Sequence, residues 1–263
     1  MLLQGKALII SGIGPGLGIK LAVECAREGA RGIVIGARTA ARLDEAEAAA
    51  RKVNAGCKVV KVVTDIRDPA QCARIAETAK NEFGRVDALV NSAFFWGTPG
   101  EVVDADLEGW KEVYQTNLIG TMQMIQAVAP VMKAQGGGAI VNVSTMASAK
   151  PHIGEAGYAA SKGAINVASK YLAAELGPSN IRVNVIRMGW MLGAPVQAYL
   201  SYAAQEQGVP EKQIYDAVAA NIALRRIVTD DECARAALFL VSDYASAVSG
   251  ATLDANGGEF MAA

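Results

Sequence analysis

The 263-residue sequence predicts a doubly wound α/β fold, in which helices cover both faces of a parallel sheet of about seven strands. Short apolar runs alternate with longer amphipathic segments along the chain, which is the first observation behind this prediction. A glycine-rich loop between the first apolar run and the first helical segment is the second. The length suits one sizeable core, and no repeat, low-complexity run or linker divides the chain, so we expect a single domain over residues 1–263.

In the first third of the chain, four strand-sized apolar runs alternate with three helical segments. Their order is strand 6–11, helix 16–28, strand 32–36, helix 39–54, strand 58–64, helix 69–83 and strand 88–91. The second helix is rich in alanine, glutamate and arginine, which favour helices. Asp68 as N-cap and Pro69 at the first helical position mark the start of the third. Strict alternation of this kind predicts parallel strands.

The rest of the chain continues the alternation, with one irregular segment. We expect a long helix at about 107–133, strand 139–144, helix 158–176, strand 181–186, helix 230–242 and strand 251–254. Three glycines at 136–138 end the long helix, and Gly177-Pro178 ends the next one. The stretch 189–210 contains aromatic residues and is expected to be irregular. We expect a substrate loop at about 189–212.

Composition excludes several classes of protein. Lysine plus arginine is 25 and aspartate plus glutamate is 26, which argues against nucleic acid or an acidic membrane surface as the main partner. The single histidine, His152, nearly excludes Ser-His-Asp chemistry and His-rich metal sites, and we expect no metal. The four cysteines form no CxxC pair and suit buried thiols in a reducing compartment: Cys25, Cys57, Cys72 and Cys233.

The N-terminus and the lengths of the apolar runs indicate where in the cell the protein is expected to be. Residues 1–11 lack a basic segment and a small-residue cleavage site, so no export signal is expected. No apolar run approaches the roughly 20 residues that a membrane helix needs. We therefore expect no membrane partner and a cytoplasmic location.

The glycine-rich loop, SGIGPGLG, begins at Ser11 and leads into the first helix. Glycines allow a sharp turn and a close approach of a pyrophosphate to the backbone amides, and the helix N-terminus faces the negative charge. An ordinary tight turn is the alternative, but the position between a first strand and a first helix favours nucleotide binding. The spacing of Gly12, Gly16 and Gly18 differs from the GxGxxG fingerprint.

This loop and six further features together resemble the short-chain dehydrogenase/reductase family, in its shorter TGxxxGxG/YxxxK branch, over nearly the whole chain. The further features are Asn91-Ser92-Ala93-Phe94, Asn117, Ser144, Tyr158-Ala159-Ala160-Ser161-Lys162, Asn184 in Arg182-Val183-Asn184, and Asn256-Gly257-Gly258. The resemblance implies a Rossmann-type sheet, an NAD(P) cofactor and a homo-oligomer, a tetramer or dimer, assembled through the long helices. Phe94, Met188 and Asn256 depart from the glycine, proline and aspartate of the family, and Phe94 and Met188 leave the shape of the substrate and nicotinamide pockets open.

The candidate reactive groups are Tyr158, Lys162, Ser144 and Asn117. Tyr158 and Lys162 lie four apart on a predicted helix, so they share a face. A nearby ammonium and a cationic nicotinamide favour the phenolate and lower the tyrosine pKa, so the phenol can exchange a proton with a substrate oxygen. Ser144 ends a strand at the carboxyl edge, where its hydroxyl can hold that oxygen.

The resemblance implies two further roles: Lys162 binds the nicotinamide ribose, and Asn117 holds a water that links Lys162 to solvent. The alternatives are a packed aromatic at Tyr158, a solvated charge at Lys162 and a plain polar helix residue at Asn117. His152 is expected to be a loop histidine and not a catalyst.

A larger set is expected to bind the cofactor: Gly12, Gly14, Gly16, Leu17, Gly18, Arg38, Asp65, Ile66, Asn91, Ser92, Ala93, Tyr158, Lys162 and Gly189. Asp65 and Ile66 resemble the pair that contacts the adenine, with a simple turn residue as the alternative for Asp65. NAD enzymes place an acid about 20 residues past the glycine loop. Ala37 and Arg38 stand there, so NADP(H) is favoured and NAD(H) is the alternative, in which Arg38 stacks on the adenine or is solvated.

Aromatic residues gather in two segments that follow strands. They are Phe94, Phe95 and Trp96, then Trp190, Tyr199 and Tyr202. We expect Phe94, Trp96, Trp190 and Tyr199 to line a pocket for a bulky apolar or aromatic substrate. A lid or an intersubunit contact is the alternative.

These observations predict an NAD(P)-dependent oxidoreductase that interconverts a small-molecule secondary alcohol and a ketone by hydride transfer. One alternative is a 3-oxoacyl-[acyl-carrier-protein] reductase-like enzyme, although no basic docking patch is evident in the sequence. An alternative of another class is a non-catalytic NAD(P)-binding sensor or scaffold. The complete set of Ser144, Tyr158 and Lys162 argues against it, because a sensor needs no proton-transfer groups.

Overall fold

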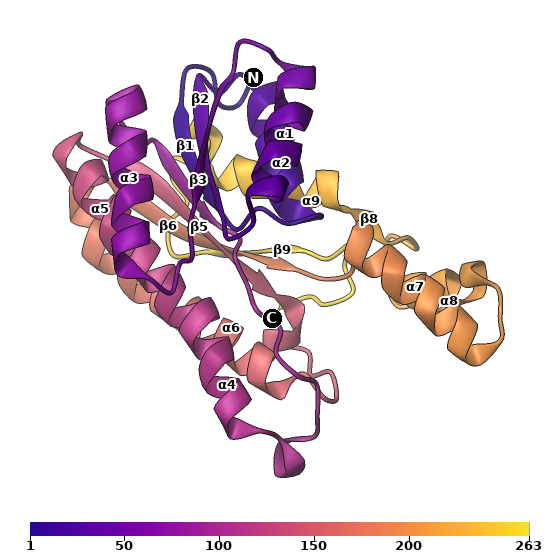
Figure 1. Ribbon diagram of the computed structural model, residues 1–263. Helices are drawn as coiled ribbons and strands as arrows, with labels where there is room; N and C mark the ends of the chain where they lie inside the picture. The colour runs from indigo at the N-terminus through magenta and orange to yellow at the C-terminus, as the bar shows by residue number, and fades with distance from the viewer. Residues whose placement is uncertain (263) are drawn as a thin grey trace.

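A seven-stranded parallel sheet forms the centre of the protein in the computed structural model, which describes residues 1–262 (Figure 1). The strands, in chain order, are β1 (Ala7–Ser11), β2 (Gly32–Ala37), β3 (Lys58–Val63), β4 (Ala88–Asn91), β5 (Gly138–Thr145), β6 (Ile181–Met188) and β9 (Thr252–Ala255). Their order in the sheet is β3-β2-β1-β4-β5-β6-β9, and every pair is parallel. The predicted doubly wound α/β fold is confirmed.

Helices cover both faces of the sheet (Figure 1). One layer contains α1 (Leu17–Arg27), α2 (Ala40–Val53) and α9 (Asp230–Val241), which share a core cluster with one side of the strands. The other contains α3 (Pro69–Phe83), α5 (Thr121–Ala134) and α6 (Ala156–Leu176), which share the second cluster. Within residues 1–262, no helix combines the length and the hydrophobicity needed to cross a bilayer.

The local signals in the sequence explain the elements. All residues of β1 and β2 are buried, as expected for strands covered on both faces. At α3, the Asp68 carboxylate accepts a hydrogen bond from the Ala70 amide (2.8 Å), and Pro69 occupies the first turn. Gly84 ends the same helix in the left-handed conformation, with φ of +72°.

The order of the strands determines where a ligand site lies. The chain builds outward from β1 to β3 and then returns to place β4 on the other side of β1. In such a sheet, the loops after β1 and β4 diverge and leave a crevice outside the carboxyl ends of the strands. The glycine-rich loop and residues 92–94 are these two loops.

The predicted long helix at 107–133 has a different structure near its middle. It consists of α4 (Leu107–Tyr114), a π-helical turn (Gln115–Gly120) and α5. The π-turn contains Asn117, whose buried side chain is bonded to another segment of the chain. A π-turn widens a helix locally and is common at functional sites.

The prediction of an irregular stretch at 189–210 is wrong. This part of the chain forms β7 (Met191–Leu192) and α7 (Ala194–Gln207), followed by α8 (Glu211–Ala219) and β8 (Val228–Thr229), which pairs with β7. Pro195 near the start of α7 and Gly208 at its end are ordinary helix boundaries. The two helices project from the sheet and pack on a small core of their own (Figure 1), and the hydrophobic pattern of α7 is weak.

Short 3-10 helices complete the described structure. They are Val102–Asp104, Met146–Ser148, Gly177–Ser179 and Asp243–Ala245. The second of these lies between β5 and α6, and it directs the chain across the carboxyl edge of the sheet. The loop that follows it, residues 149–155, therefore lies beside the crevice described above.

Candidate active site

A cleft of about 910 Å³ lies at the carboxyl edge of the sheet. It brings together every predicted site residue except Asn91 and Asn117. The predicted residues that line it are Gly12, Gly14, Gly16, Leu17, Gly18, Arg38, Asp65, Ile66, Ser92, Ala93, Phe94, Trp96, Ser144, Tyr158, Lys162, Gly189, Trp190 and Tyr199. Within residues 1–262, no group of three or more histidine, cysteine or acidic side chains is arranged to hold a metal ion.

The glycine-rich loop is shaped by close backbone contacts. Gly12 has φ of +95°, and a Cβ there would lie 2.1 Å from the Ala93 nitrogen. A Cβ on Gly18 would lie 2.3 Å from the Gly12 carbonyl oxygen. Gly14, in contrast, faces open space, and no side chain caps the N-terminus of α1. The loop thus leaves backbone and a helix N-terminus facing the cleft, an arrangement that suits a pyrophosphate.

Three reactive side chains meet at the other end of the cleft. Ser144 is the second-to-last residue of β5 and is buried, and its hydroxyl lies 3.5 Å from the Lys162 carbonyl oxygen. Lys162 is also buried, and its Nζ donates a hydrogen bond to the carbonyl oxygen of Val143 (2.9 Å). Tyr158 lies one turn earlier on α6, so helix packing on β5 places the three groups together.

Burial changes the pKa values of two of these groups. It lowers the pKa of Lys162 to about 8, because a buried ammonium loses its hydration. Burial also raises the pKa of Tyr158 well above its usual value near ~10. The Glu155 carboxylate raises the Tyr158 pKa further, whereas a hydrogen bond with Thr145 lowers it. Among the protein's own groups, the Tyr158 pKa is thus raised and not lowered as predicted, because burial and the Glu155 charge both favour the neutral phenol.

Asn117 is fully buried and does not line the cleft. Its side-chain oxygen accepts a hydrogen bond from the Phe95 amide (2.7 Å). Its Nδ2 donates to the Phe95 carbonyl oxygen and to Ser161 Oγ, both at 2.9 Å. Asn117 therefore ties the segment after β4 to α6, and its role in a proton relay stays a prediction.

The side chain of Asn91 is likewise held by hydrogen bonds within the protein. Its Oδ1 accepts a hydrogen bond from Ser11 Oγ (3.2 Å), and its Nδ2 donates to Asn142 Oδ1 (2.9 Å). These bonds join β1, β4 and β5 beneath the cleft. Ser92 and Ala93, the next two residues, do line it.

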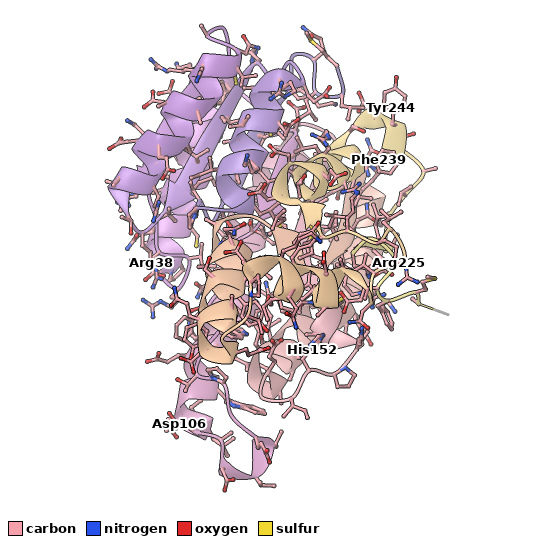
Figure 2. All side chains as sticks on the ribbon, turned by 90° about the vertical axis from the view of Figure 1, so that its right-hand side faces the viewer. Arg38, Asp106, His152, Arg225, Phe239 and Tyr244 are labelled. Atoms are coloured by element: carbon pink, nitrogen blue, oxygen red, sulfur yellow. The ribbon has the colours of Figure 1, made fainter. Side chains whose placement is uncertain are left out.

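The far end of the cleft carries Arg38, Asp65 and Ile66. Among residues 1–262, Arg38 forms no ion pair or side-chain hydrogen bond, and it is exposed beside the cleft (Figure 2). Asp65 is paired with Arg67 through an Nη2–Oδ2 contact of 2.7 Å, which holds the Asp65 pKa below its usual range. A cationic side chain without a partner at this edge suits an anionic ligand.

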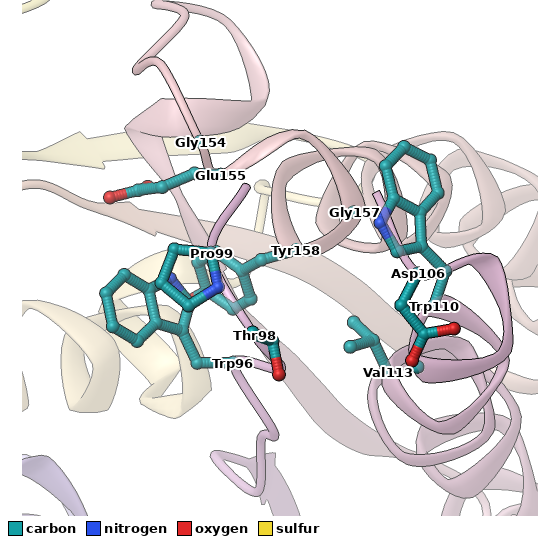
Figure 3. Close-up of a pocket in the computed structure, with 11 residues that line it drawn as sticks. Trp96, Thr98, Pro99, Asp106, Trp110, Val113, Gly154, Glu155, Gly157 and Tyr158 are labelled. Atoms are coloured by element: carbon teal, nitrogen blue, oxygen red, sulfur yellow. The ribbon is translucent and has the colours of Figure 1, made fainter. Parts of the chain in front are cut away.

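Aromatic side chains surround the reactive end. The rings of Phe94 and Tyr158 are 6.2 Å apart, and those of Trp190 and Tyr199 are 5.2 Å apart. Trp96 lines both the cleft and a small pocket beside Tyr158, where it lies opposite Trp110 (Figure 3). The other two predicted aromatics, Phe95 and Tyr202, do not line the cleft.

Two departures from the family pattern lie close together. Met188 is buried and lines the cleft, next to Gly189. A Cβ on Gly189 would lie 2.7 Å from the Cβ of Asn256. Asn256 in turn accepts a hydrogen bond from the Gly258 amide (2.8 Å) and so holds the C-terminal turn. Met188 and Gly189 thus line the cleft, and Asn256 packs against Gly189.

Sequence reasoning missed several residues that line the cleft. Among them are Thr64, Thr145, Met146 and Glu155, and His152 lines it as well. Thr145 directly follows Ser144, and this adjacency was a usable signal, whereas Glu155 precedes the predicted helix 158–176 and had none. The position of His152 depends on the turn before α6, for which the sequence offered no such signal.

Comparison with known proteins supports this geometry. The family model described as enoyl-(acyl carrier protein) reductase matches residues 12–259. Dehydrogenase/reductase SDR family member 4 of Oryctolagus cuniculus is 31% identical over 97% of this chain and 94% of its own, and the 3alpha-hydroxysteroid dehydrogenase of Mediterraneibacter gnavus is 32% identical over 98% of both. The structure of L-sorbose reductase from Gluconobacter frateurii, complexed with NADPH and L-sorbose, has a TM-score of 0.93, 29% identity, and coverage of 100% and 99%. With its sheet order, glycine loop and Tyr158–Lys162 helix, the chain belongs to the short-chain dehydrogenase/reductase family of oxidoreductases.

Proposed function

We propose that this protein is an NAD(P)-dependent oxidoreductase that interconverts a secondary alcohol and a ketone on a bulky apolar or aromatic substrate. The observation that carries the proposal is the meeting of Ser144, Tyr158 and Lys162 in the cleft that begins at the glycine-rich loop. The names of similar proteins support the exchange of an alcohol and a ketone, since they include hydroxysteroid dehydrogenases and an L-sorbose reductase. Only the steroid names agree with a bulky apolar substrate, because sorbose is a polar sugar.

The residues along the cleft fit a dinucleotide. Gly14 and the start of α1 would hold the pyrophosphate, and Asp65 with Ile66 would contact the adenine. Lys162 would bind the nicotinamide ribose, and the rest of the predicted binding set, among them Ser92, Ala93, Asn91 and Gly189, would support the nicotinamide. When bound, the nicotinamide supplies or accepts the hydride.

Side chains of the protein bind the substrate oxygen and transfer its proton. Ser144 donates a hydrogen bond that holds the oxygen in place, and Tyr158 gives or takes the proton. A raised pKa keeps the phenol protonated but makes it a weaker acid, so proton donation would need the positive charges of Lys162 and of the oxidised nicotinamide to lower the Tyr158 pKa. In the proposal, Lys162 and a water held at Asn117 return the proton from solvent.

Arg38 supports a preference for NADP(H). Its guanidinium is exposed beside the cleft and has no partner among the described residues. Position 37 is alanine, so no carboxylate there repels a 2′-phosphate. Proteins of similar structure are described with NADPH or with NAD+, and the choice here is part of the proposal.

The proposal extends to organisation. One catalytic domain spans residues 1–263, and segment 189–212, largely α7, contributes to the substrate pocket. Homo-oligomers form through the π-turn, α5 and α6, where Ile119 of the π-turn and Val167 and Tyr171 of α6 are exposed. The four cysteines are buried and unpaired, in keeping with a reducing, cytoplasmic location. Nucleic acid and membrane are not among the proposed partners.

A second candidate is a 3-oxoacyl-[acyl-carrier-protein] reductase. The matching family model is described as an acyl-carrier-protein reductase, and the 3-oxoacyl-[acyl-carrier-protein] reductase of Thermotoga maritima is 33% identical over 98% of this chain. This candidate predicts activity on carrier-linked 3-oxoacyl chains that exceeds activity on free aryl ketones.

The deciding experiment offers both substrate classes to the purified protein with NADPH and with NADH. Reduced-cofactor absorbance is followed over time. Turnover of free bulky ketones, lost in Tyr158→Phe, supports the proposal, whereas turnover of carrier-linked substrates alone supports the second candidate. Tight cofactor binding with no turnover of either class would identify a sensor or scaffold.

A further inference from the structure

A carboxylate and an imidazole without partners face the reacting end of the cleft. Glu155 and His152 both line the cleft that contains Tyr158 and Ser144. The Glu155 carboxylate forms no hydrogen bond or ion pair within residues 1–262. The Nε2 atom of His152 is buried and has no hydrogen-bond partner. Polar groups of this kind are costly to leave unpaired, so a ligand that pairs them gains affinity.

The loop that carries these residues is held in place. Gly154 takes the left-handed conformation, with φ of +87°, and its carbonyl oxygen accepts a hydrogen bond from the Gly100 amide (3.0 Å). The Glu155 amide donates to the His152 carbonyl oxygen (3.2 Å). The two side chains are therefore presented by an ordered turn that packs on the segment after β4.

No lysine or arginine among the described residues is paired with Glu155, although Arg38 and Lys162 line the same cleft. Asp65, the other acid that lines the cleft, is paired with Arg67. Lys162 donates to a backbone carbonyl, and Lys150, in the same loop as His152, is paired with Glu259 at 2.9 Å. Burial raises the pKa of Glu155, as expected for a carboxylate without a cation, and its proximity to His152 lowers it only in part.

The walls near Glu155 are aromatic. Phe94, Trp96, Trp190 and Tyr199 line the same cleft, and Figure 3 shows Glu155 and Trp96 on the same side of Tyr158. Aromatic faces attract cations as well as apolar groups. One carboxylate among aromatic side chains is an arrangement that binds an organic ammonium.

We propose that Glu155, assisted by His152, binds a protonated amine on the substrate, so that the preferred substrates are amino ketones or amino alcohols with an apolar or aromatic body. This inference rests on the proposed function, because it assigns the substrate class of the same site. Glu155 is a specificity-determining residue, and Tyr158 and Ser144 remain the groups that act on the reacting oxygen. A carrier-linked or carboxylate substrate would meet repulsion at Glu155.

If Glu155 had only a structural role, the preference for the amine would survive Glu155→Gln. Glu155 is the N-cap residue of α6, and an acid there stabilises the helix dipole. Its side chain makes no capping hydrogen bond, however. Glu108 offers a matched control, because it is an acid in the first turn of α4, is exposed and does not line the cleft.

The test uses acetophenones that carry an aminomethyl, ethyl, hydroxymethyl or carboxymethyl group at the meta or para position. These compounds share one reacting carbonyl and nearly one shape. In the wild type, kcat/KM for the aminomethyl compound should exceed that for the ethyl compound by about tenfold or more, and the carboxymethyl compound should be the poorest. Glu155→Gln should reduce this ratio to about threefold or less, whereas Glu108→Gln should retain it. The ratio of the two kcat/KM values cancels any effect of Glu155→Gln on Tyr158, because that effect is the same for both compounds.

Binding measurements separate failure of this inference from failure of the proposed function. Calorimetric titration of the enzyme with the aminomethyl and ethyl compounds, in the presence of NADPH, needs no turnover. Tighter binding of the amine that disappears in Glu155→Gln supports the inference even if no ketone is reduced, in which case the proposed function fails alone. Equal binding of the two compounds, a preference for the hydroxymethyl compound, or an amine preference that survives Glu155→Gln would overturn it.

Discussion

A side-chain carbon at position 12 would lie 2.1 Å from the backbone nitrogen of Ala93, so the loops after β1 and β4 touch only because residue 12 is glycine. These loops flank the crevice in which the cofactor is proposed to bind. The contact therefore links the stability of the sheet edge to the shape of the site.

Gly12→Ala should destabilise the protein by about 2 kcal/mol or more, because it adds a clash to a positive φ. Gly14→Ala is the control, since open space surrounds Gly14, and its free energy of unfolding should stay within about 0.5 kcal/mol of the wild type. Urea unfolding measures both. Equal stabilities of the two variants would contradict the contact.

Tyr158→Phe should lower kcat by about 10²–10⁴-fold and leave cofactor affinity nearly unchanged, because only the hydroxyl is removed. Lys162→Ala should impair both quantities, since it removes the proposed ribose contact as well. Steady-state kinetics and fluorescence titration with NADPH provide the measurements. More than about a tenth of wild-type activity in Tyr158→Phe would exclude the general acid/base role.

The buried ammonium of Lys162 predicts a dependence of stability on pH. Its pKa is about 8 in the folded protein and 10.5 as the ordinary value, so between these values the unfolded state binds more protons. The contribution of Lys162 to the free energy of unfolding therefore rises with pH between these two values. Relative to Lys162→Met, the wild type should gain about 2 kcal/mol between pH 7 and pH 9.5 in urea unfolding. A constant difference would show that Lys162 is not desolvated.

Cofactor preference should follow residues 37 and 38. The wild type should have the higher kcat/KM with NADPH, and the double variant Ala37→Asp, Arg38→Ile should shift the preference toward NADH, because an acid repels the 2′-phosphate. Kinetics with both cofactors measure this. A wild type that favours NADH by tenfold, roughly 1.4 kcal/mol, would show that Arg38 does not select the phosphate.

Substrate size should matter because aromatic side chains surround the reactive end. Two-ring ketones should have a higher kcat/KM than acetone, since each buried methylene contributes roughly 0.8 kcal/mol. Phe94→Ala and Trp190→Ala should weaken this preference, whereas Tyr202→Ala, outside the cleft, should retain it. Equal efficiency toward small and large ketones would argue against an apolar pocket.

Local patterns in the sequence determined the sheet and most of the site. Alternating apolar runs and turn residues located the seven strands and the helices that cover them, since both periodicities are properties of neighbouring residues. The glycine spacing after β1 and the four-residue spacing of Tyr158 and Lys162 identified two ends of one cleft. Parallel strands bring their carboxyl ends to one edge, so these distant motifs had to meet.

Helix α7 was not predicted, because it packs on a small core outside the sheet and its hydrophobic pattern is weak. Helix α8 has a clear amphipathic pattern, which the prediction from the sequence missed. The side chain of Asn117, in the π-turn, forms hydrogen bonds with Phe95 and Ser161. Both partners are distant in the sequence, so local patterns did not predict this turn.

Only the tertiary structure decided how the reactive groups are charged and what faces them. The raised pKa of Tyr158 arises from burial, and burial depends on segments that the sequence places far apart. The same holds for His152 and Glu155, whose turn faces the cleft because it is bonded to Gly100, more than 50 residues away. The spacing of residues along a helix predicts which side chains share a face. The solvation of these side chains, and hence their pKa values, depends on the segments that the folded chain packs against that face.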